Sequence, residues 1–282
     1  MVKIITDSTS DLSADLLERF NIDVLPLHIL LGDEEFEDGK TITPERIYEW
    51  ADENKTTPKT SAPSEVFAKE LFEKNLEKYD ELIVFTISFS MSTSGNVCRL
   101  AAEELEAEDK IHVVDSKNLS TGIGLLVVKA AELAKEGKNA KEILEVIDSL
   151  IPNVRASFVV DTLEYLHRGG RCSGLAAMMG TVLKLHPKIV VKDGAMLPEK
   201  KYRGAIDNVI MNYAKDMESE IKSAYKDRVF ITHSGCDAKV VNSVKDYLKS
   251  LNIFDEIHET RAGGVVSSHC GPGTLGVLYI MK

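Results

Sequence analysis

A run of hydroxyl side chains between Thr86 and Cys98 carries the densest candidate chemistry of the chain. Hydroxyl groups donate and accept hydrogen bonds without a fixed charge, so such a cluster is suited to hold an oxyanion or a carboxyl group. Capping a helix N-terminus is the ordinary role of Ser and Thr at turns, but a single cap uses one hydroxyl. Both interpretations stay open for the five hydroxyls of the run, which are Ser88, Ser90, Ser92, Thr93 and Ser94.

The elements predicted around this run place it at the edge of a sheet. Residues 82–85 are apolar and predict a buried strand, and residues 99–105 have the pattern of a helix start. In open α/β sheets, ligands bind beyond the carboxyl ends of the strands, where a helix N-terminus offers unpaired N–H groups. The same order of strand, polar turn and helix opens the chain over residues 2–20, with Asp7 and neighbouring hydroxyls in the turn.

His269 is the candidate imidazole. It precedes Gly271-Pro272-Gly273, which predicts a rigid turn that presents the ring toward a cleft. A serine near a histidine would also suit a hydrolase, but the chain has neither a G-x-S-x-G motif nor a phosphate-binding loop. The histidines to which we assign surface or structural roles are His112, His186 and His258.

Composition favours a small-molecule or protein partner. The 282 residues are 44% hydrophobic, and their net charge of −11 argues against binding nucleic acid, which requires a clustered basic surface. The chain shows no secretory signal, and no apolar run reaches the ~18–20 residues that span a bilayer, so we expect a cytoplasmic protein. The spacing of cysteines and histidines indicates neither disulfides nor a metal site.

The order of predicted elements indicates a two-domain α/β protein. Strands alternating with helices over residues 1–153 predict a doubly wound, mainly parallel sheet with helices on both faces. Over residues 154–282 we expect a second α/β domain with a mixed sheet, including a hairpin at Asp193-Gly194. We expect residues 55–64 to be irregular, and the apolar stretch 175–185 to suit either an apolar ligand or a core helix.

At several places the chain resembles the DegV family of bacterial fatty-acid-binding proteins, which includes the binding subunits of fatty acid kinase. The resemblance covers nearly the whole chain in blocks that keep their order. These blocks are Thr6 to Leu12, Lys59 to Ser64, Ser88 to Ser94, Asp115-Ser116, Gly169-Gly170-Arg171, Leu197 to Gly204 and His269 to Gly273.

The resemblance implies one long acyl chain in a buried tunnel between or beside the domains, with its carboxyl group near the interdomain cleft. It implies a fatty-acid-binding set of Thr60, Ser61, Ser92, Thr93, Ser94 and His269, and assigns Arg171 and Arg203 to partner docking or the tunnel mouth. The chain departs from the family pattern at Ser92-Thr93-Ser94 (commonly Ser-Gly-Thr), His269-Cys270-Gly271 (often His-Thr-Gly) and Leu185-His186-Pro187 (Ile-Lys-Pro).

The implied function is non-catalytic: the protein extracts a long-chain fatty acid during transient membrane contact and presents it to a fatty acid kinase. It would use no metal or cofactor. A buried carboxylate facing only neutral hydroxyls would be costly, so either the acid is protonated or His269 and an arginine share its charge. Two alternatives are a Ser/His hydrolase or phosphoryl-transfer enzyme, and a lipid-binding regulator or carrier without a kinase partner.

Overall fold

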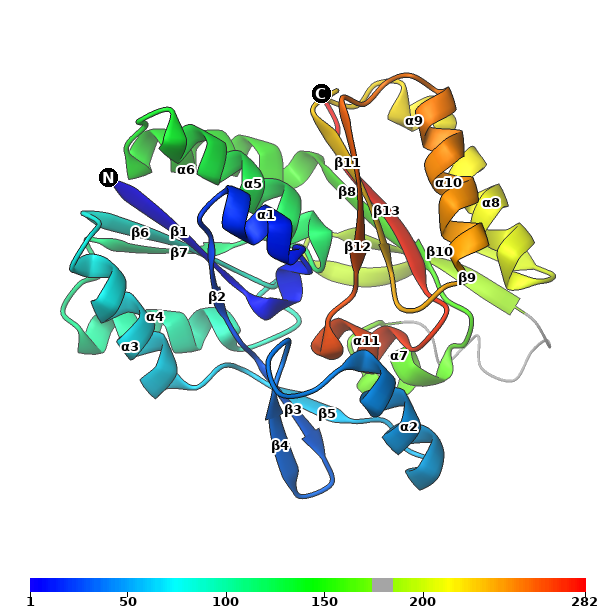
Figure 1. Cartoon of the computed structure of the whole chain (residues 1–282), viewed down its shortest axis with the longest axis horizontal. Helices are drawn as coiled ribbons and strands as arrows, with labels where there is room; N and C mark the ends of the chain where they lie inside the picture. The colour runs from blue at the N-terminus through cyan, green and yellow to red at the C-terminus, as the bar shows by residue number, and fades with distance from the viewer. Residues whose placement is uncertain (174–184) are drawn as a thin grey trace.

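The computed structural model describes residues 1–173 and 185–282 and contains a parallel sheet in the N-terminal half (Figure 1). Its strands run in the order β2-β1-β6-β7, and all their pairings are parallel. The sheet consists of β1 (Val2–Asp7), β2 (Asp23–Leu25), β6 (Glu81–Thr86) and β7 (Ile111–Asp115).

Helices cover both faces of this sheet because successive strand residues point to opposite sides. Ile83 and Phe85 pack toward α1 (Ala14–Arg19), α5 (Thr121–Lys135) and α6 (Ala140–Leu150). Leu82 and Val84 pack toward α3 (Glu65–Leu76) and α4 (Ser94–Glu104). The predicted doubly wound parallel sheet is confirmed.

The C-terminal half contains a six-stranded mixed sheet in the order β10-β9-β8-β13-β11-β12. The β11–β12 pair is parallel and the other neighbours are antiparallel. The strands are β8 (Val154–Val159), β9 (Leu185–Lys192), β10 (Ala195–Arg203), β11 (Arg228–His233), β12 (Glu256–Arg261) and β13 (Leu275–Ile280). Helices α8 (Ile206–Asp216), α9 (Glu218–Ile221) and α10 (Ala238–Ser250) line one side (Figure 1).

Helix α5 connects the two sheets through a shared core. Its buried residues belong to one apolar cluster that also contains Ile83 and Phe85 of the first sheet and Phe158 and Leu278 of the second. This arrangement explains why the helix is apolar on nearly all sides. The domain boundary predicted at residue 153 falls in the 3-10 turn Ile151–Asn153, and the position of this boundary stays a prediction.

A third, small sheet was not predicted. Strand β3 (His28–Leu31) pairs with β4 (Glu34–Glu37) on one side and β5 (Lys59–Ser61) on the other, and α2 (Pro44–Asn54) follows β4. The expectation of irregular structure throughout residues 55–64 is therefore wrong at β5. This strand has three polar residues, and only its pairing with β3 makes it a strand.

The helix that carries His269 was not predicted. The histidine lies in the last turn of α11 (Gly264–Cys270), and the predicted Gly-Pro-Gly turn follows the helix. Figure 1 shows α11 beside α2 and α7 (Glu164–Gly169). The seven-residue helix begins at Gly264, the second of two adjacent glycines, and its short length and weak helix formers gave no periodic signal.

Helix α6 begins with a reciprocal capping box between Asn139 and Glu142. The hairpin predicted at Asp193-Gly194 is confirmed. Asp193 and Gly194 both have positive φ, 50° and 81°, as a tight hairpin turn between β9 and β10 requires. The prediction for the apolar stretch 175–185 lies outside the described residues except for Leu185, which begins β9.

Candidate functional site

A cavity of about 460 Å³ lies where β5, α11 and the turn after β6 meet. Its volume falls within the roughly 300–1,000 Å³ of typical small-molecule pockets. The polar part of its lining includes Thr60, Ser61, Ser90, Ser92, Thr93, Arg171 and His269. The apolar part includes Leu27, Ile87, Met91, Leu119, Met196, Val265 and Val266. The cavity therefore has the two-sided chemistry expected for an amphipathic ligand.

Thr60 and His269 form the best-defined polar contact of this cavity. The Oγ1 of Thr60, on β5, lies 2.9 Å from Nε2 of His269, at the end of α11. The Nδ1 of His269 is buried and has no hydrogen-bond partner among the described residues. A Cβ atom built on Gly169 would lie 2.4 Å from this Nδ1, so glycine lets the backbone of α7 approach the ring.

These contacts favour one tautomer of His269. A proton on Nδ1 would bury an unpaired N–H donor against Gly169, whereas a proton on Nε2 is donated to Thr60 Oγ1. Burial, with a smaller effect of the nearby Arg171 guanidinium, lowers the pKa of His269 to about 4. The imidazole is therefore neutral near pH 7, and we assign its proton to Nε2. Thr60 can then direct its own hydroxyl proton into the cavity.

The hydroxyls after β6 serve several purposes. Ser92 Oγ accepts a hydrogen bond from Ser94 N (3.2 Å) and lies 2.8 Å from Ser94 Oγ, so it satisfies the start of α4. Thr93 is the N-cap residue but makes no side-chain cap bond, and it lines the cavity. Ser88 donates to Gly194 O at 2.7 Å and so ties the turn to the β9–β10 hairpin.

The predicted site residues are therefore only partly brought together. Thr60, Ser61, Ser92, Thr93 and His269 all line the cavity, whereas Ser94 is buried behind Ser92. That these six residues contact a bound fatty acid stays a prediction.

The two predicted arginines lie in different places. Arg171 lines the cavity with an exposed side chain whose Nη1 donates to Gly169 O at 2.7 Å. Arg203 is the exposed last residue of β10 and does not line this cavity. Its assignment to partner docking stays a prediction.

A family model described as an uncharacterised protein of the DegV family matches residues 1–282. The chain belongs to the DegV family. A relative from Thermotoga maritima described as a fatty acid-binding protein is 32% identical, over 98% of this chain and 96% of the relative. A solved structure from Thermus thermophilus, described as fatty acid binding of a DegV family protein, is 30% identical with a TM-score of 0.91. The similarity covers 100% of this chain and 99% of that one.

A solved structure from Eubacterium ventriosum, described as a fat acid (stearic acid)-binding protein, is 28% identical with a TM-score of 0.86. The similarity covers 100% of this chain and 99% of that one. These neighbours confirm the two-domain α/β fold class for this DegV chain.

Sequence reasoning missed most of the apolar wall of this DegV cavity. Met196 comes from β10 and Leu27 from the segment between β2 and β3, far from the hydroxyl run in the sequence. Val265 and Val266 lie within one helical turn of the predicted His269, and this proximity was a usable signal. The sequence around Leu27 and Met196 has no pattern that distinguishes these two residues from ordinary core residues.

Sequence reasoning also assigned no function to three buried aspartates near the cavity. Asp7, Asp11 and Asp38 are at most 6% exposed. Burial raises the pKa of Asp7 to about 6 and that of Asp11 to about 8, and it also raises the pKa of Asp38. In the described part of the chain, no three His, Cys, Asp or Glu side chains are arranged to hold a metal ion.

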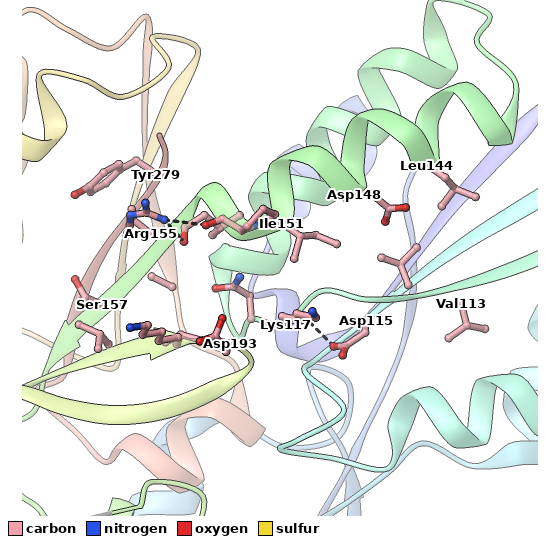
Figure 2. Close-up of a pocket in the computed structure, with 18 of the residues that line it drawn as sticks. Val113, Asp115, Lys117, Leu144, Asp148, Ile151, Arg155, Ser157, Asp193 and Tyr279 are labelled. Atoms are coloured by element: carbon pink, nitrogen blue, oxygen red, sulfur yellow. Dashed lines mark hydrogen bonds between the residues drawn. The ribbon is translucent and has the colours of Figure 1, made fainter. Parts of the chain in front are cut away.

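A larger cleft of about 1,210 Å³ separates β7 and α6 from β8 and β9 (Figure 2). Some of its charged groups pair with each other or with the backbone: Arg155 pairs with Glu220 at 3.0 Å, and Asp115 accepts from Lys117 N at 3.0 Å. None of the predicted site residues lines this cleft. We therefore take the smaller, two-sided cavity as the candidate site of the DegV chain.

Proposed function

We propose that this protein binds one long-chain fatty acid in the smaller cavity, with its carboxyl group near Thr60, Ser92 and His269. The observation that carries this proposal is the division of one cavity into a hydroxyl and imidazole wall and an apolar wall. Each buried CH₂ group of the tail contributes ~0.8 kcal/mol, so the apolar wall would supply most of the affinity. The fatty acid binding described for the relatives supports the same assignment.

Arg171 is our candidate counter-ion for the carboxylate. Of the described residues that line the cavity, it alone carries a fixed charge, because His269 is neutral near pH 7. A carboxylate held by hydroxyl donors with an exposed guanidinium at its edge avoids the cost of an unpaired buried charge.

We further propose that the protein acts as a non-catalytic subunit that presents the carboxyl group to a fatty acid kinase. An acyl phosphate can form only if the carboxyl oxygens are accessible, and the exposed Thr93 and Arg171 lie at the polar part of the cavity. Because a kinase needs ATP, we place this step in the cytoplasm, with transient membrane contact to load the acid. Among residues 1–173 and 185–282, no helix has the length and hydropathy needed to cross a bilayer.

One observation favours a second candidate, a hydrolase in which His269 activates Thr60, because their reactive atoms are 2.9 Å apart. A general base of this kind is normally oriented by a third group, but Nδ1 of His269 has no partner among the described residues. A pKa near 4 also makes the imidazole a weak base. The binding function therefore has the stronger support.

Mass spectrometry of lipid extracted from the purified protein tests the binding function. We expect a long-chain fatty acid equimolar with the chain, and a bound nucleotide in place of any lipid would overturn the proposal. Incubation with ATP and magnesium tests the presenting role. The acid should stay unmodified with the protein alone and become acyl phosphate when a fatty acid kinase is added, whereas turnover or hydrolysis by the chain alone would make it an enzyme.

A further inference from the structure

Two buried carboxylates from the N-terminal half hold the start of α11, the helix that carries His269. Asp11 Oδ1 accepts a hydrogen bond from Gly263 N at 2.7 Å, and Asp38 Oδ1 accepts one from Gly264 N, also at 2.7 Å. These bonds join segments 252 and 226 residues apart in the sequence. The α11 backbone is thus fixed by side chains of the polar turn after β1 and of the loop after β4.

The carboxylates approach this backbone closely at two glycines. A Cβ atom on Gly264 would lie 3.0 Å from Asp38 Oδ1 and 2.5 Å from the Cδ1 of Ile29. A Cβ atom on Gly263 would lie 3.2 Å from Asp11 Oδ1 and 3.3 Å from Asp38 Oδ1. The two glycines and the two acids therefore form one closely fitted contact.

The second oxygen of each carboxylate is also held. Ser120 Oγ donates to Asp11 Oδ2, and Ser8 Oγ donates to Asp38 Oδ2 at 2.8 Å. Ser8 Oγ in turn accepts from the backbone N of Leu27, which is itself a residue of the cavity wall, at 3.1 Å. Each acid is thus bonded through both oxygens, which fixes its orientation as well as its position.

We propose that Asp11 and Asp38 are positioning residues of the fatty-acid site, which hold α11 so that His269 stays in hydrogen-bond contact with Thr60. A helix of seven residues spans only ~10 Å and moves as a rigid body, so a shift at Gly264 reaches His269. The inference rests on the proposed binding of a fatty acid. It gives a role to the polar turn of residues 6–12, which contacts the cavity only indirectly.

Asp38→Ala is the variant that tests this role, because it removes both oxygens. Asp38→Asn keeps an acceptor for Gly264 N and places a donor toward Ser8 Oγ, so it serves as the conservative variant. Asp23→Ala is the matched control, since the Asp23 carboxylate pairs with Lys3 at 2.7 Å and with Asn75 at 2.9 Å and does not contact α11.

The readout is the carboxyl ¹³C resonance of [1-¹³C]palmitic acid bound to each protein, measured beside palmitate content and melting temperature. We expect Asp38→Ala to keep palmitate, with affinity reduced no more than about tenfold, but to displace or broaden the carboxyl resonance. Asp38→Asn should restore the wild-type resonance. Asp23→Ala should lower the melting temperature and leave the resonance unchanged.

An unchanged resonance in a folded, palmitate-loaded Asp38→Ala protein would overturn the positioning role and leave Asp38 a purely structural residue. If Asp38→Ala does not fold, Gly263→Ala replaces it, because its φ of −66° suits alanine while its Cβ would crowd both carboxylates. The same displacement is then expected, and its absence overturns the inference. Failure of wild-type protein to bind palmitate would instead contradict the proposed function.

Discussion

Thr60 and His269 are 209 residues apart in the chain, and their side chains meet at 2.9 Å in the wall of one cavity. Neither residue has another described side-chain partner that explains this placement. The contact links the small third sheet to the helix α11 and marks the polar end of the proposed fatty-acid site. Four predictions test how this cavity works.

Removal of the Thr60 hydroxyl should weaken fatty-acid binding modestly. Thr60→Val keeps the β-branched shape that suits strand β5 but removes one donor, and a net hydrogen bond contributes ~0.5–1.5 kcal/mol. We expect affinity for a fluorescent fatty acid to fall by about threefold to tenfold. Thr60→Ser, which keeps the hydroxyl, should bind like the wild type; equal losses in both variants would show that the hydroxyl makes no contact with the ligand.

His269→Ala should reduce acyl phosphate formation by an added fatty acid kinase far more than it reduces lipid binding. The tail supplies most of the affinity, whereas a misplaced carboxyl group slows transfer while the ligand stays bound. Lipid content, transfer rate and melting temperature should be measured on the same protein. His112→Ala is a control, because His112 of β7 pairs with Glu81 of β6 at 3.0 Å and does not line the cavity. A parallel fall in melting temperature and lipid content, with transfer per bound lipid unchanged, would make His269 a structural residue.

The neutral His269 should make the protein less stable in acid. Its folded pKa of about 4 lies below its ordinary value of 6.5, so the unfolded chain binds more protons between these pH values. The free energy of unfolding should therefore fall as the pH drops from 6.5 to 4, by on the order of 3 kcal/mol from this group. Urea unfolding of His269→Gln should lack this part of the pH dependence. Identical pH profiles for the two proteins would mean that His269 is solvated or charged in the folded state.

Leu119 should control which acyl chains fit. It lines both the 460 Å³ cavity and a neighbouring cavity of about 30 Å³, which also shares Val266 and Cys270. Leu119→Ala should join the two spaces and shift the extracted acids toward longer or branched chains, as read by mass spectrometry. Leu125→Ala is the control, because this core leucine of α5 is 1% exposed and does not line the cavity; it should cost ~2–5 kcal/mol of stability without changing the lipid profile.

Local sequence patterns predicted some of the site and could not predict the rest. Ser92 and Thr93 were found because a buried strand, a hydroxyl turn and a helix start follow each other within the local sequence. Thr60 entered only through the resemblance to a family, because three polar residues become a strand only when β3 pairs with them. His269 was identified as the important histidine, but its helix was not, since contacts from Asp11 and Asp38 hold it.

Helix α5 contributes to the cores of both large sheets, so the chain should unfold cooperatively as one unit. A ligand that binds only the folded state stabilises every part of such a unit, by an amount set by its concentration relative to its dissociation constant. A bound ligand would then also stabilise the strands of either sheet that lie far from the cavity. Loss of the lipid would lower the resistance of the whole chain to proteolysis.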